Sequence, residues 1–535
     1  MIENLIFEFQ NNPACGRSSV GTGCSRRSPP LDSVDGSGCL LETVRWVGKK
    51  RRSTTHLYLH RVPLTARGGC HCFFPAMSDL IFNDTIAALS SPSGTGAVAL
   101  LRVSGRTAHE IGLEVFQRKP FKLDGLDSLT PRKALFGQIM DLNGNRIDDV
   151  LLTFFKGPAS YTGEDTLEIS CHGGLLVTQR VLERLFQAGA RPAGPGEFTQ
   201  RAFLNGKLDL TQAEAVMDVI SAQTDRALQA AHQQLDGALG RTILSLQQEL
   251  LGITAHIEAY IDFPEEDIDP DTGHSLQQRM NALLGRLTAL LATADQGRLL
   301  REGVRTVLAG APNAGKSSLL NRLLGFERAI VSAQPGTTRD TIEEVINLRG
   351  FPIRLIDTAG LRVDSADTLE EAGMARTEAQ LAHADLILEI VDASQPRGNL
   401  PPLAVMAAVR HLLILHKSDL PQDPSWAAHA KDGLPVSSHT GQGLEALTTR
   451  IVETITTGGS SFENSGVAVN ARHKACLETA RSALSASMEE FVRGTSVEYV
   501  ALDLRLAMEA LGDIVGHVDV EDILGAIFSQ FCIGK

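Results

Sequence analysis

The chain has 535 residues, of which 43% are hydrophobic and 21% are charged, with a net charge of −13. This composition is typical of a globular protein with several domains, and it excludes a chain that is disordered throughout. No uncharged apolar run approaches the roughly 18 residues that a membrane-spanning helix needs, which excludes an integral membrane protein. Because the charge is negative, a nucleic-acid partner would have to be met by a local basic patch.

The first 76 residues differ from the rest of the chain. Ten Lys and Arg against five Asp and Glu give them a net charge of +5, which leaves −18 for the remainder, and they hold five of the eight cysteines. They have no helical or strand periodicity and no signal-peptide pattern, and Cys70-His71-Cys72 lacks a second ligand pair at zinc spacing. We interpret them as a disordered arm or as the product of a start assigned upstream of Met77. The scattered remaining cysteines are typical of a reducing compartment, and we expect a cytoplasmic protein.

Residues 77–193 have the pattern of a small α+β domain. Apolar strand-like runs occur at 85–89, 96–105, 150–155 and 166–170, and residues 175–189 have the apolar spacing of a helix. A cluster of Gly and Pro at 191–198 would end this domain.

The rest of the chain indicates an all-α domain that is split in sequence. Residues 211–260 contain no Pro and have apolar positions every three or four residues, which predicts a long helix or a helix pair. Helical spacing returns at 275–300, 470–493 and 497–515, whereas the segment between the two helical blocks alternates strand and helix patterns. We therefore predict a helical domain formed by 194–300 and 459–535, with an α/β domain inserted at 301–458.

The inserted segment begins with a P-loop in the context that this motif requires. An apolar strand leads into Gly310-x4-Gly315-Lys316-Ser317, and a helical pattern follows. The glycines let main-chain amides surround phosphate groups at a helix N-terminus, where the helix dipole also favours anions. We expect Lys316 to reach the β- and γ-phosphates and the Ser317 hydroxyl to bind Mg²⁺.

Two further motifs would complete the phosphate and Mg²⁺ site. The loop at 336–340 offers a second hydroxyl ligand for Mg²⁺, and Thr338 is our candidate. A strand then delivers Asp357-Thr358-Ala359-Gly360, in which Asp357 could reach Mg²⁺ through water and the Gly360 amide could sense the γ-phosphate.

A pair of later motifs indicates that the base is guanine. Lys417-x-Asp419 follows an apolar strand. The Asp419 carboxylate can accept hydrogen bonds from N1–H and the 2-amino group of guanine, which adenine cannot match, and Lys417 can lie along the ring. Ser437 and Ser438 can then close over the base.

The chain departs from the usual motifs at two positions. His416 stands where the base motif normally opens with Asn, so we expect the tie that Asn makes between loops to be altered and His416→Asn to tighten GTP binding. Leu361 follows DTAG, where regulatory GTPases often have a water-orienting Gln, and a leucine cannot hydrogen-bond water. Another group must therefore orient the attacking water.

These motifs together resemble the MnmE (TrmE) family of tRNA-modification GTPases, from about residue 80 to Lys535. The resemblance rests on GAPNAGKSSLLNRLLG, GTTRD, DTAGL, SYTGEDTLEISCHGG, RPAGPGEFTQRAFLNGKLDLTQAEA and the terminal FCIGK. The PGEF…NGKLDL block and CIGK are the most specific of these. The resemblance implies an α+β N-terminal domain that binds folate and dimerises, an all-α helical domain, and an α/β G domain inserted in it.

The resemblance also implies a K⁺-dependent GTPase reaction. K⁺ against the phosphates can stand in for an arginine finger, and its ligands would be Asn313, Ser332, Gln334 and Thr337. The family's water-positioning acid falls on Glu370, with Glu371 beside it as the alternative. The expected GTP-binding residues are Asn313, Ala314, Gly315, Lys316, Ser317, Ser318, Ser332, Ala333, Gln334, Pro335, Gly336, Thr337, Thr338, Asp357, Thr358, Ala359, Gly360, Lys417, Asp419, Ser437 and Ser438.

Further implications concern folate and partners. A one-carbon tetrahydrofolate, in its 5-formyl or methylene form, would contact Arg102, Glu168, Lys207 and Lys535, and Cys532 lies in the same C-terminal motif. The homodimer would join an MnmG-like flavoprotein in a heterotetramer, with FAD supplied only by the partner. Together they would place an aminomethyl or carboxymethylaminomethyl group on carbon 5 of the wobble uridine of certain tRNAs.

Two alternatives from other classes remain at this stage. A ribosome-assembly switch GTPase of the Era or Der type would carry a basic KH-like module after the G domain, but the segment after 458 is helical in pattern and acidic in places. A scaffold with a vestigial P-loop is opposed by intact Lys316, Ser317, Thr338 and Asp357.

Overall fold

The computed structural model describes residues 84–118, 129–262, 272–326, 343–357, 383–397, 409–456, 468–494, 497–516, 521–529 and 531–535. The expected extension at 1–76 lies outside these residues. The chain divides into two units, Met1–Cys72 and Phe73–Lys535, and every described residue belongs to the second. Within the described ranges, no helix is both long enough and apolar enough to cross a membrane.

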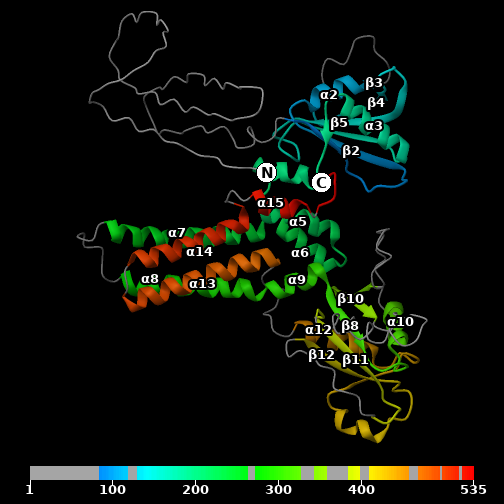
Figure 1. Ribbon diagram of the computed structural model, residues 1–535, viewed down its shortest axis with the longest axis vertical. Coiled ribbons are helices and arrows are strands. Elements are labelled where there is room, and N and C mark those ends of the chain that lie inside the picture. The colour runs from blue at the N-terminus through cyan, green and yellow to red at the C-terminus, as the bar shows by residue number, and fades with distance from the viewer. Residues whose placement is uncertain are drawn as a thin grey trace, which may run out of the picture. The chain divides into compact units, whose positions relative to one another are not determined.

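A seven-stranded sheet forms the first part of this unit (Figure 1). Its order is β3-β4-β5-β6-β2-β1-β7, and neighbours are antiparallel except for the parallel pair of β1 and β7. Strand residues alternate between a buried face and a more exposed one, so that Leu101, Leu152 and Ile169 are fully buried beneath two helices. The elements are β1 (Ile86–Leu89), β2 (Val98–Ser104), α2 (Ala108–Val115), β3 (Phe116–Arg118), β4 (Ala134–Met140), β5 (Arg146–Phe155), β6 (Thr166–His172), α3 (Leu175–Gln187) and β7 (Arg191–Pro192).

The segment expected to form a long helix or helix pair at 211–260 contains three helices, so that expectation was wrong. After α4 (Glu197–Leu204) come α5 (Leu210–Ser221), α6 (Asp225–Leu235) and α7 (Ala238–Asp262). The Thr224 side chain caps the start of α6 by accepting from the Ala227 amide, and Gly237 has φ +79° between α6 and α7. A threonine cap and a left-handed glycine thus interrupt the apolar pattern without any proline.

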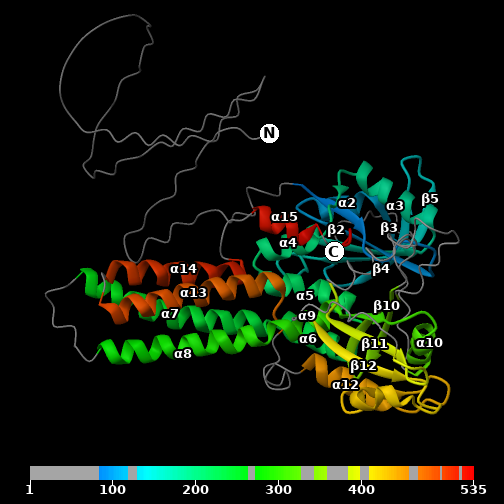
Figure 2. The same cartoon turned by 60° about the horizontal axis from the view of Figure 1, so that its bottom comes forward.

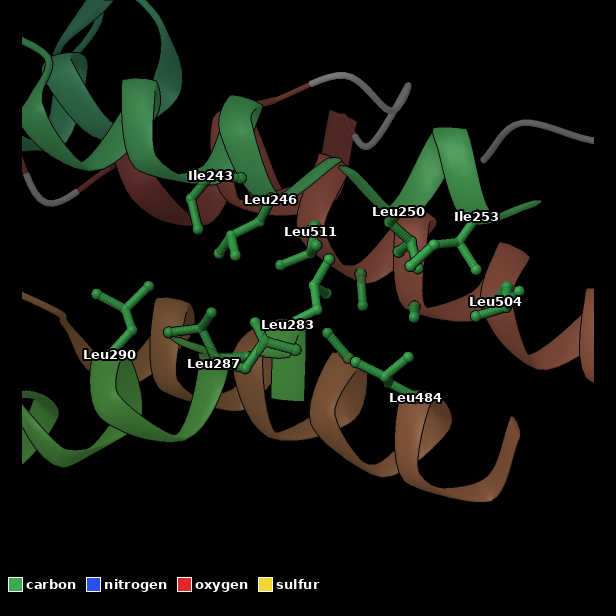
Figure 3. Close-up of a cluster of buried hydrophobic side chains, with 14 of the residues drawn as sticks. Ile243, Leu246, Leu250, Ile253, Leu283, Leu287, Leu290, Leu484, Leu504 and Leu511 are labelled. Atoms are coloured by element: carbon green, nitrogen blue, oxygen red, sulfur yellow. The ribbon is translucent and has the colours of Figure 1, made fainter. Parts of the chain in front are cut away.

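Helices from both sides of the inserted segment share one apolar core. The helices α7, α8 (Thr272–Ala292), α13 (Ala471–Arg493) and α14 (Val497–Val515) lie side by side in both views (Figures 1 and 2). Figure 3 shows Leu250 and Ile253 of α7 above Leu283 of α8, and all three are almost fully buried. This common core is the physical reason why two sequence segments about 160 residues apart form one helical bundle.

The inserted segment folds into a six-stranded sheet of order β13-β12-β11-β8-β10-β9. All neighbours are parallel except the outer pair of β10 and β9. The carboxyl ends of five strands therefore meet at one edge, where α/β proteins bind ligands. The elements are β8 (Val304–Ala309), α10 (Lys316–Phe326), β9 (Glu343–Leu348), β10 (Phe351–Asp357), β11 (Leu386–Asp392), β12 (Arg410–His416), η1 (Pro424–His429), β13 (Leu434–Val436) and α12 (Leu444–Thr456).

Helix α5 makes an ion pair and hydrogen bonds to the two segments that join the inserted domain to the helical domain. At the entry, Asp218 lies 2.6 Å from Nε of Arg301, in α9 (Ala294–Glu302), which leads into β8. At the exit, Glu214 accepts a 2.8 Å hydrogen bond from Nε of Arg472 and a 2.9 Å bond from Nδ2 of Asn470, which caps α13. Two carboxylates one helical turn apart thus fix the places where the chain enters and leaves the insertion.

Candidate functional site

The P-loop wraps around the end of β8 in the conformation that its glycines permit. Gly310 has φ +150°, and a Cβ there would lie 2.1 Å from the carbonyl oxygen of Ile390 in β11. Asn313 has φ +66° and Gly315 φ +105°, just before α10 begins at Lys316. The loop therefore curves into the N-terminus of α10. A glycine-rich loop followed by a helix N-terminus is an arrangement that binds phosphate through main-chain amides.

Lys316 lies within this loop. Its side chain is buried, and Nζ donates to the carbonyl oxygens of Gly310 at 2.8 Å and Ala311 at 3.0 Å. Ala314 is buried beside it, whereas Asn313, Ser317 and Ser318 are exposed around the first turn of α10. The ammonium group and two hydroxyls thus occur together where a nucleotide's phosphates and their Mg²⁺ would bind.

Asp357 is the last residue of β10 and pairs in register with Leu308 of β8. Its main chain therefore ends beside the start of the P-loop. The other predicted phosphate, switch and potassium residues lie outside the described residues: Ser332, Ala333, Gln334, Pro335, Gly336, Thr337, Thr338, Thr358, Ala359, Gly360 and Glu370. Among the described residues, no group of three or more His, Cys, Asp or Glu could hold a metal ion by itself.

The predicted base-recognition residues lie at the same edge, after β12 and β13. Lys417 has φ +59°, and Asp419 accepts a 2.6 Å hydrogen bond from the hydroxyl of buried Ser437. This bond holds the pKa of Asp419 below its usual value, so the exposed carboxylate is an ionised acceptor at neutral pH. An ionised acceptor of this kind suits the two N–H donors of guanine.

Asp392, which sequence reasoning missed, is the ionic partner of Lys417. It ends β11, in register with His416 of β12, and its Oδ2 lies 2.6 Å from Nζ of Lys417. Burial alone would raise the pKa of Asp392, but hydrogen bonds from Lys417 and Ser394 outweigh it and lower the pKa. The only signal in the sequence was an aspartate at the end of an apolar strand.

The expectation that His416 alters the tie between loops is corrected by the structure. The buried imidazole hydrogen-bonds both loops, with Nδ1 3.0 Å from the Ala314 carbonyl oxygen and Nε2 2.7 Å from the Ser438 hydroxyl oxygen. A histidine can do this because its two ring nitrogens point in different directions, as the oxygen and nitrogen of an Asn side chain do. Because the histidine already connects the two loops, the structure gives no reason for His416→Asn to tighten GTP binding.

The second group of predicted residues lies on the N-terminal sheet. Arg102 of β2 pairs across the strands with Glu168 of β6, and its Nη2 lies 2.8 Å from Glu168 Oε1. The guanidinium carbon is 5.0 Å from the ring centre of Tyr161 and 5.7 Å from that of Phe198. A cation, a carboxylate and two aromatic rings therefore lie together, a set suited to a flat, charged ligand.

The last four residues of the chain, 532–535, form a tail that docks beside this group. The Phe198 amide donates to the Lys535 carbonyl oxygen at 3.1 Å, and the Ser90 hydroxyl donates to that of Gly534 at 2.9 Å. Gly534 has φ +99°, and a Cβ there would lie 2.1 Å from the Leu89 carbonyl oxygen. The tail thus fits a space that only glycine can enter, which brings Lys535 close to Phe198.

Two predicted residues of this region have less direct connections. Lys207 is exposed, and its Nζ donates to the Pro158 carbonyl oxygen at 3.0 Å, in the loop that also carries Tyr161. Cys532 has a free, exposed thiol. Its main-chain carbonyl oxygen accepts a hydrogen bond from the Gly196 amide at 3.4 Å. The structure therefore brings Arg102, Glu168 and the tail together. Lys207 is connected to them only indirectly, through the loop that carries Pro158 and Tyr161.

A buried ion-pair network, also missed from the sequence, supports the loop on which the tail rests. Arg201 is fully buried, and its guanidinium contacts the carboxylates of Asp84, Glu164 and Glu197. Glu197 also lies 2.6 Å from Nη2 of Arg191. Burial alone would raise the pKa of Glu197, but hydrogen bonds from these arginines outweigh it and lower the pKa, so Glu197 is ionised at neutral pH.

The part of the chain after the insertion bears on the ribosome-assembly alternative. From residue 468 onward, the described residues form α13, α14 and α15 (Glu521–Phe528), with one isolated bridge between Pro195 and Ile533. No sheet of a KH-like RNA module occurs among these described residues, which disfavours a switch of the Era or Der type.

Comparisons with known proteins identify the family. A model described as the N-terminus of the GTP-binding protein TrmE matches residues 85–207, and one described as the MnmE helical domain matches residues 210–532. A relative from Akkermansia muciniphila named tRNA modification GTPase MnmE is 52% identical over 456 residues, 84% of this chain and 99% of its own length. A protein of the same name from Opitutus terrae is 46% identical over 457 residues, with coverage of 84% and 99%.

Among solved structures, the G domain of the T. maritima FeoB iron transporter is 29% identical and covers 28% of this chain and 98% of its own length, with a TM-score of 0.22. The two family models and the long, closely similar relatives agree with the nucleotide-binding edge described above. The chain therefore belongs to the MnmE (TrmE) family of tRNA modification GTPases, and it hydrolyses GTP in the modification of tRNA.

Proposed function

We propose that this protein is a K⁺-dependent GTPase that works with an MnmG-like flavoprotein in the cytoplasm. Together they add an aminomethyl or carboxymethylaminomethyl group to carbon 5 of the wobble uridine of certain tRNAs. The observation that carries this proposal is the presence of two separate candidate ligand sites in one chain of this family. One is a nucleotide site at the edge of a parallel sheet, and the other is a cationic and aromatic site at the C-terminal tail.

In the nucleotide site, each residue would have a distinct part in hydrolysis. Water attacks the γ-phosphorus, the bond to the β–γ bridging oxygen breaks, and GDP and phosphate leave. Lys316 and the P-loop amides would stabilise the charge that develops, while Ser317 and Thr338 would hold Mg²⁺. Glu370 would orient the attacking water, because Leu361 has no polar group.

Potassium would neutralise negative charge that develops on the phosphates during hydrolysis. It would take the part of an arginine finger, which the motifs of this chain do not provide. Its proposed ligands are Asn313, Ser332, Gln334 and Thr337. Asn313 supports this part, because its side chain is exposed within the P-loop. Such an ion would supply positive charge to the phosphates in place of an arginine finger.

In the tail site, we propose a one-carbon tetrahydrofolate, in the 5-formyl or methylene form. Arg102, Lys207 and Lys535 would suit its glutamate carboxylates, and Glu168 would suit the amino and amide edge of the pterin. Tyr161 and Phe198 support the assignment because their rings offer flat apolar surfaces beside the Arg102 guanidinium. Cys532 would lie at the rim of this site.

The proposed assembly is a homodimer that joins the flavoprotein in a heterotetramer, with FAD only on the partner. An exposed apolar pair supports the homodimer. Phe136 of β4 and Leu151 of β5 are register partners with 51% and 48% exposure, and their sequence neighbours Leu135 and Leu152 are buried on the opposite face, under the helices. Exposed apolar residues on a sheet face are typical of surfaces that associate.

The function is tested by mass spectrometry of wobble nucleosides from a strain in which the gene is deleted. We expect the modified uridine to disappear and to return when the wild-type gene is supplied. Supply of Lys316→Ala should not restore it, because that variant lacks the phosphate-binding ammonium group. An unchanged nucleoside profile in the deletion strain would contradict the proposal.

The potassium assignment is tested with the purified protein. GTP hydrolysis in K⁺ should exceed that in Na⁺ by at least about tenfold, because the smaller ion cannot span the same set of oxygens, and the rate per molecule should rise with protein concentration. Asn313→Ala should remove the K⁺ response. Equal rates in the two salts would refute the assignment while leaving the GTPase identity intact.

A further inference from the structure

The residue before Lys417 is a histidine that connects two loops of the nucleotide site. His416 ends β12 and is 3% exposed. Its Nδ1 lies 3.0 Å from the carbonyl oxygen of Ala314 in the P-loop, and its Nε2 lies 2.7 Å from the Ser438 hydroxyl oxygen. The side chain therefore joins the phosphate-binding loop to the loop that closes over the base.

The two partners define which ring nitrogen carries the proton. A carbonyl oxygen can only accept, so Nδ1 of His416 must donate to Ala314. In the neutral ring Nε2 then has a free lone pair, which accepts the hydrogen of the Ser438 hydroxyl. One neutral tautomer thus satisfies both contacts, whereas a protonated ring would have two donors and would force the Ser438 hydroxyl to turn.

The ring packs directly against the P-loop backbone. A Cβ at Gly315 would lie 2.3 Å from both Cε1 and Nδ1 of His416. Glycine at this position therefore leaves the space that the imidazole fills, and a shift of the ring would move the loop that holds the phosphates.

Burial and the groups around the ring together disfavour its protonation. Burial lowers the pKa of His416, and Lys417, next in the chain, lowers it further. The hydrogen bond to Ala314 and the carboxylates of Asp392 and Asp419 act in the opposite direction but do not reverse the shift. The remaining titratable neighbours, Lys316 after Gly315 and His439 after Ser438, bring no further carboxylate.

We propose that His416 is a positioning residue that, as a neutral imidazole, fixes the P-loop against Ser438, so that guanine-nucleotide binding by this chain weakens on acidification more than it would with asparagine at this position. The inference goes beyond the proposed function, because it requires neither potassium nor folate nor a partner protein.

The direction of the pH effect follows from linkage. Since the neutral form makes both contacts, the tie is complete above the ordinary histidine pKa of about 6.5 and is lost as the pH falls through the lowered value in the folded protein. Asparagine has no such titration. A comparison of the two residues in the same protein therefore isolates the effect of the ring.

The test measures the affinity of a fluorescent GDP analogue for the full chain between pH 8 and pH 5.5. At pH 8, His416→Ala should bind roughly tenfold more weakly, the scale of losing two ordinary hydrogen bonds, and His416→Asn should recover most of that loss. As the pH falls from 8 to 5.5, the ratio of wild-type affinity to His416→Asn affinity should decrease. Protonation of the nucleotide's own phosphates is common to both proteins and cancels in their ratio.

A second measurement does not depend on the stability of the alanine variant. In protein labelled with ¹⁵N-histidine, NMR at pH 8 should show a protonated Nδ1 and an unprotonated Nε2 for His416, assigned by comparison with His416→Asn. An affinity ratio of wild type to His416→Asn that is constant with pH, or a ring protonated at Nε2 instead, would overturn the proposal.

Discussion

The two candidate ligand sites of this protein are built in different ways. The nucleotide site consists of loops that follow successive strands of one parallel sheet, and main-chain groups of the P-loop form much of it. The tail site consists of side chains from β2, β6 and α4 together with the last four residues of the chain, which are more than 300 residues distant in sequence.

This difference determines how each site should respond to amino-acid substitutions and how each can be recognised from the sequence. A phosphate cradle needs glycines and a helix N-terminus at fixed spacing, so a short motif specifies it. The tail site needs charges that are paired across strands and a helix, α4, that is anchored by the ion pairs of the buried Arg201. Substitutions in the first site should therefore act locally on the nucleotide, whereas those in the second should act through docking of the tail.

The largest expected effect is in the base contact. Asp419→Asn should weaken GTP binding by roughly a hundredfold or more, because two charge-assisted hydrogen bonds to guanine are lost. Xanthosine triphosphate, whose ring offers an acceptor in place of the 2-amino group, should bind the variant better than GTP does. Competition binding with GTP, XTP and ATP measures this, and a variant that still prefers GTP would show that another residue selects the base.

The next effect concerns the chemical step. Glu370→Ala should lower kcat by about a hundredfold, the scale of losing a positioned proton or water partner, with little change in GTP affinity. Glu371→Ala is the matched control and should retain most of the activity. Single-turnover hydrolysis distinguishes the two, and a silent Glu370→Ala beside an inactive Glu371→Ala would reassign the role to the neighbouring residue.

A smaller effect, confined to the other site, should follow from Gly534→Ala. The new Cβ would lie 2.1 Å from the Leu89 carbonyl oxygen, so the tail should undock and binding of 5-formyltetrahydrofolate should weaken by about tenfold. Gly494→Ala is the control, because that glycine has φ +67° but no atom within 4 Å of the added Cβ. If both variants bind folate like the wild type, the tail is not part of the site.

The smallest effect should come from removal of the first 76 residues. A chain that begins at Met77 should fold, bind both ligands and hydrolyse GTP like the full chain, because no residue assigned to either site precedes it. Circular dichroism, calorimetry and a phosphate-release assay check the three properties. Loss of any of them would show that the extension contributes to the machinery.

In the N-terminal domain, β1, β2, β5, β6 and α3 were predictable because their periodicity is local, whereas β3, β4, β7 and α2 were not predicted. Helix boundaries within 211–260 were not, since the threonine cap at Thr224 and the glycine at Gly237 are weaker signals than a proline. In the nucleotide site, Lys316, Asp419 and Ser437 follow from motifs. Asp392 does not, because its pairing with Lys417 depends on β11 lying beside β12, and no motif contains the strand order.

The tail site shows the limit of sequence reasoning more clearly. Arg102 and Glu168 were found only through resemblance to a family, since single charges on strands are usual on protein surfaces. That the tail reaches Ser90 and Phe198 depends on long-range packing, and no local pattern predicts it. The buried Arg201 network was missed for the same reason.

We propose that this one chain holds two ligand sites that bind their ligands independently of each other. Calorimetry with a non-hydrolysable GTP analogue and 5-formyltetrahydrofolate, on the wild type, Lys316→Ala and Arg102→Ala, tests it most directly. We expect Lys316→Ala to lose the GTP analogue and to keep folate, and Arg102→Ala to lose folate and to keep the GTP analogue. Folate binding that is unchanged in Arg102→Ala would exclude Arg102 from the folate site, and a folded variant that loses both ligands would show that the two sites are not independent.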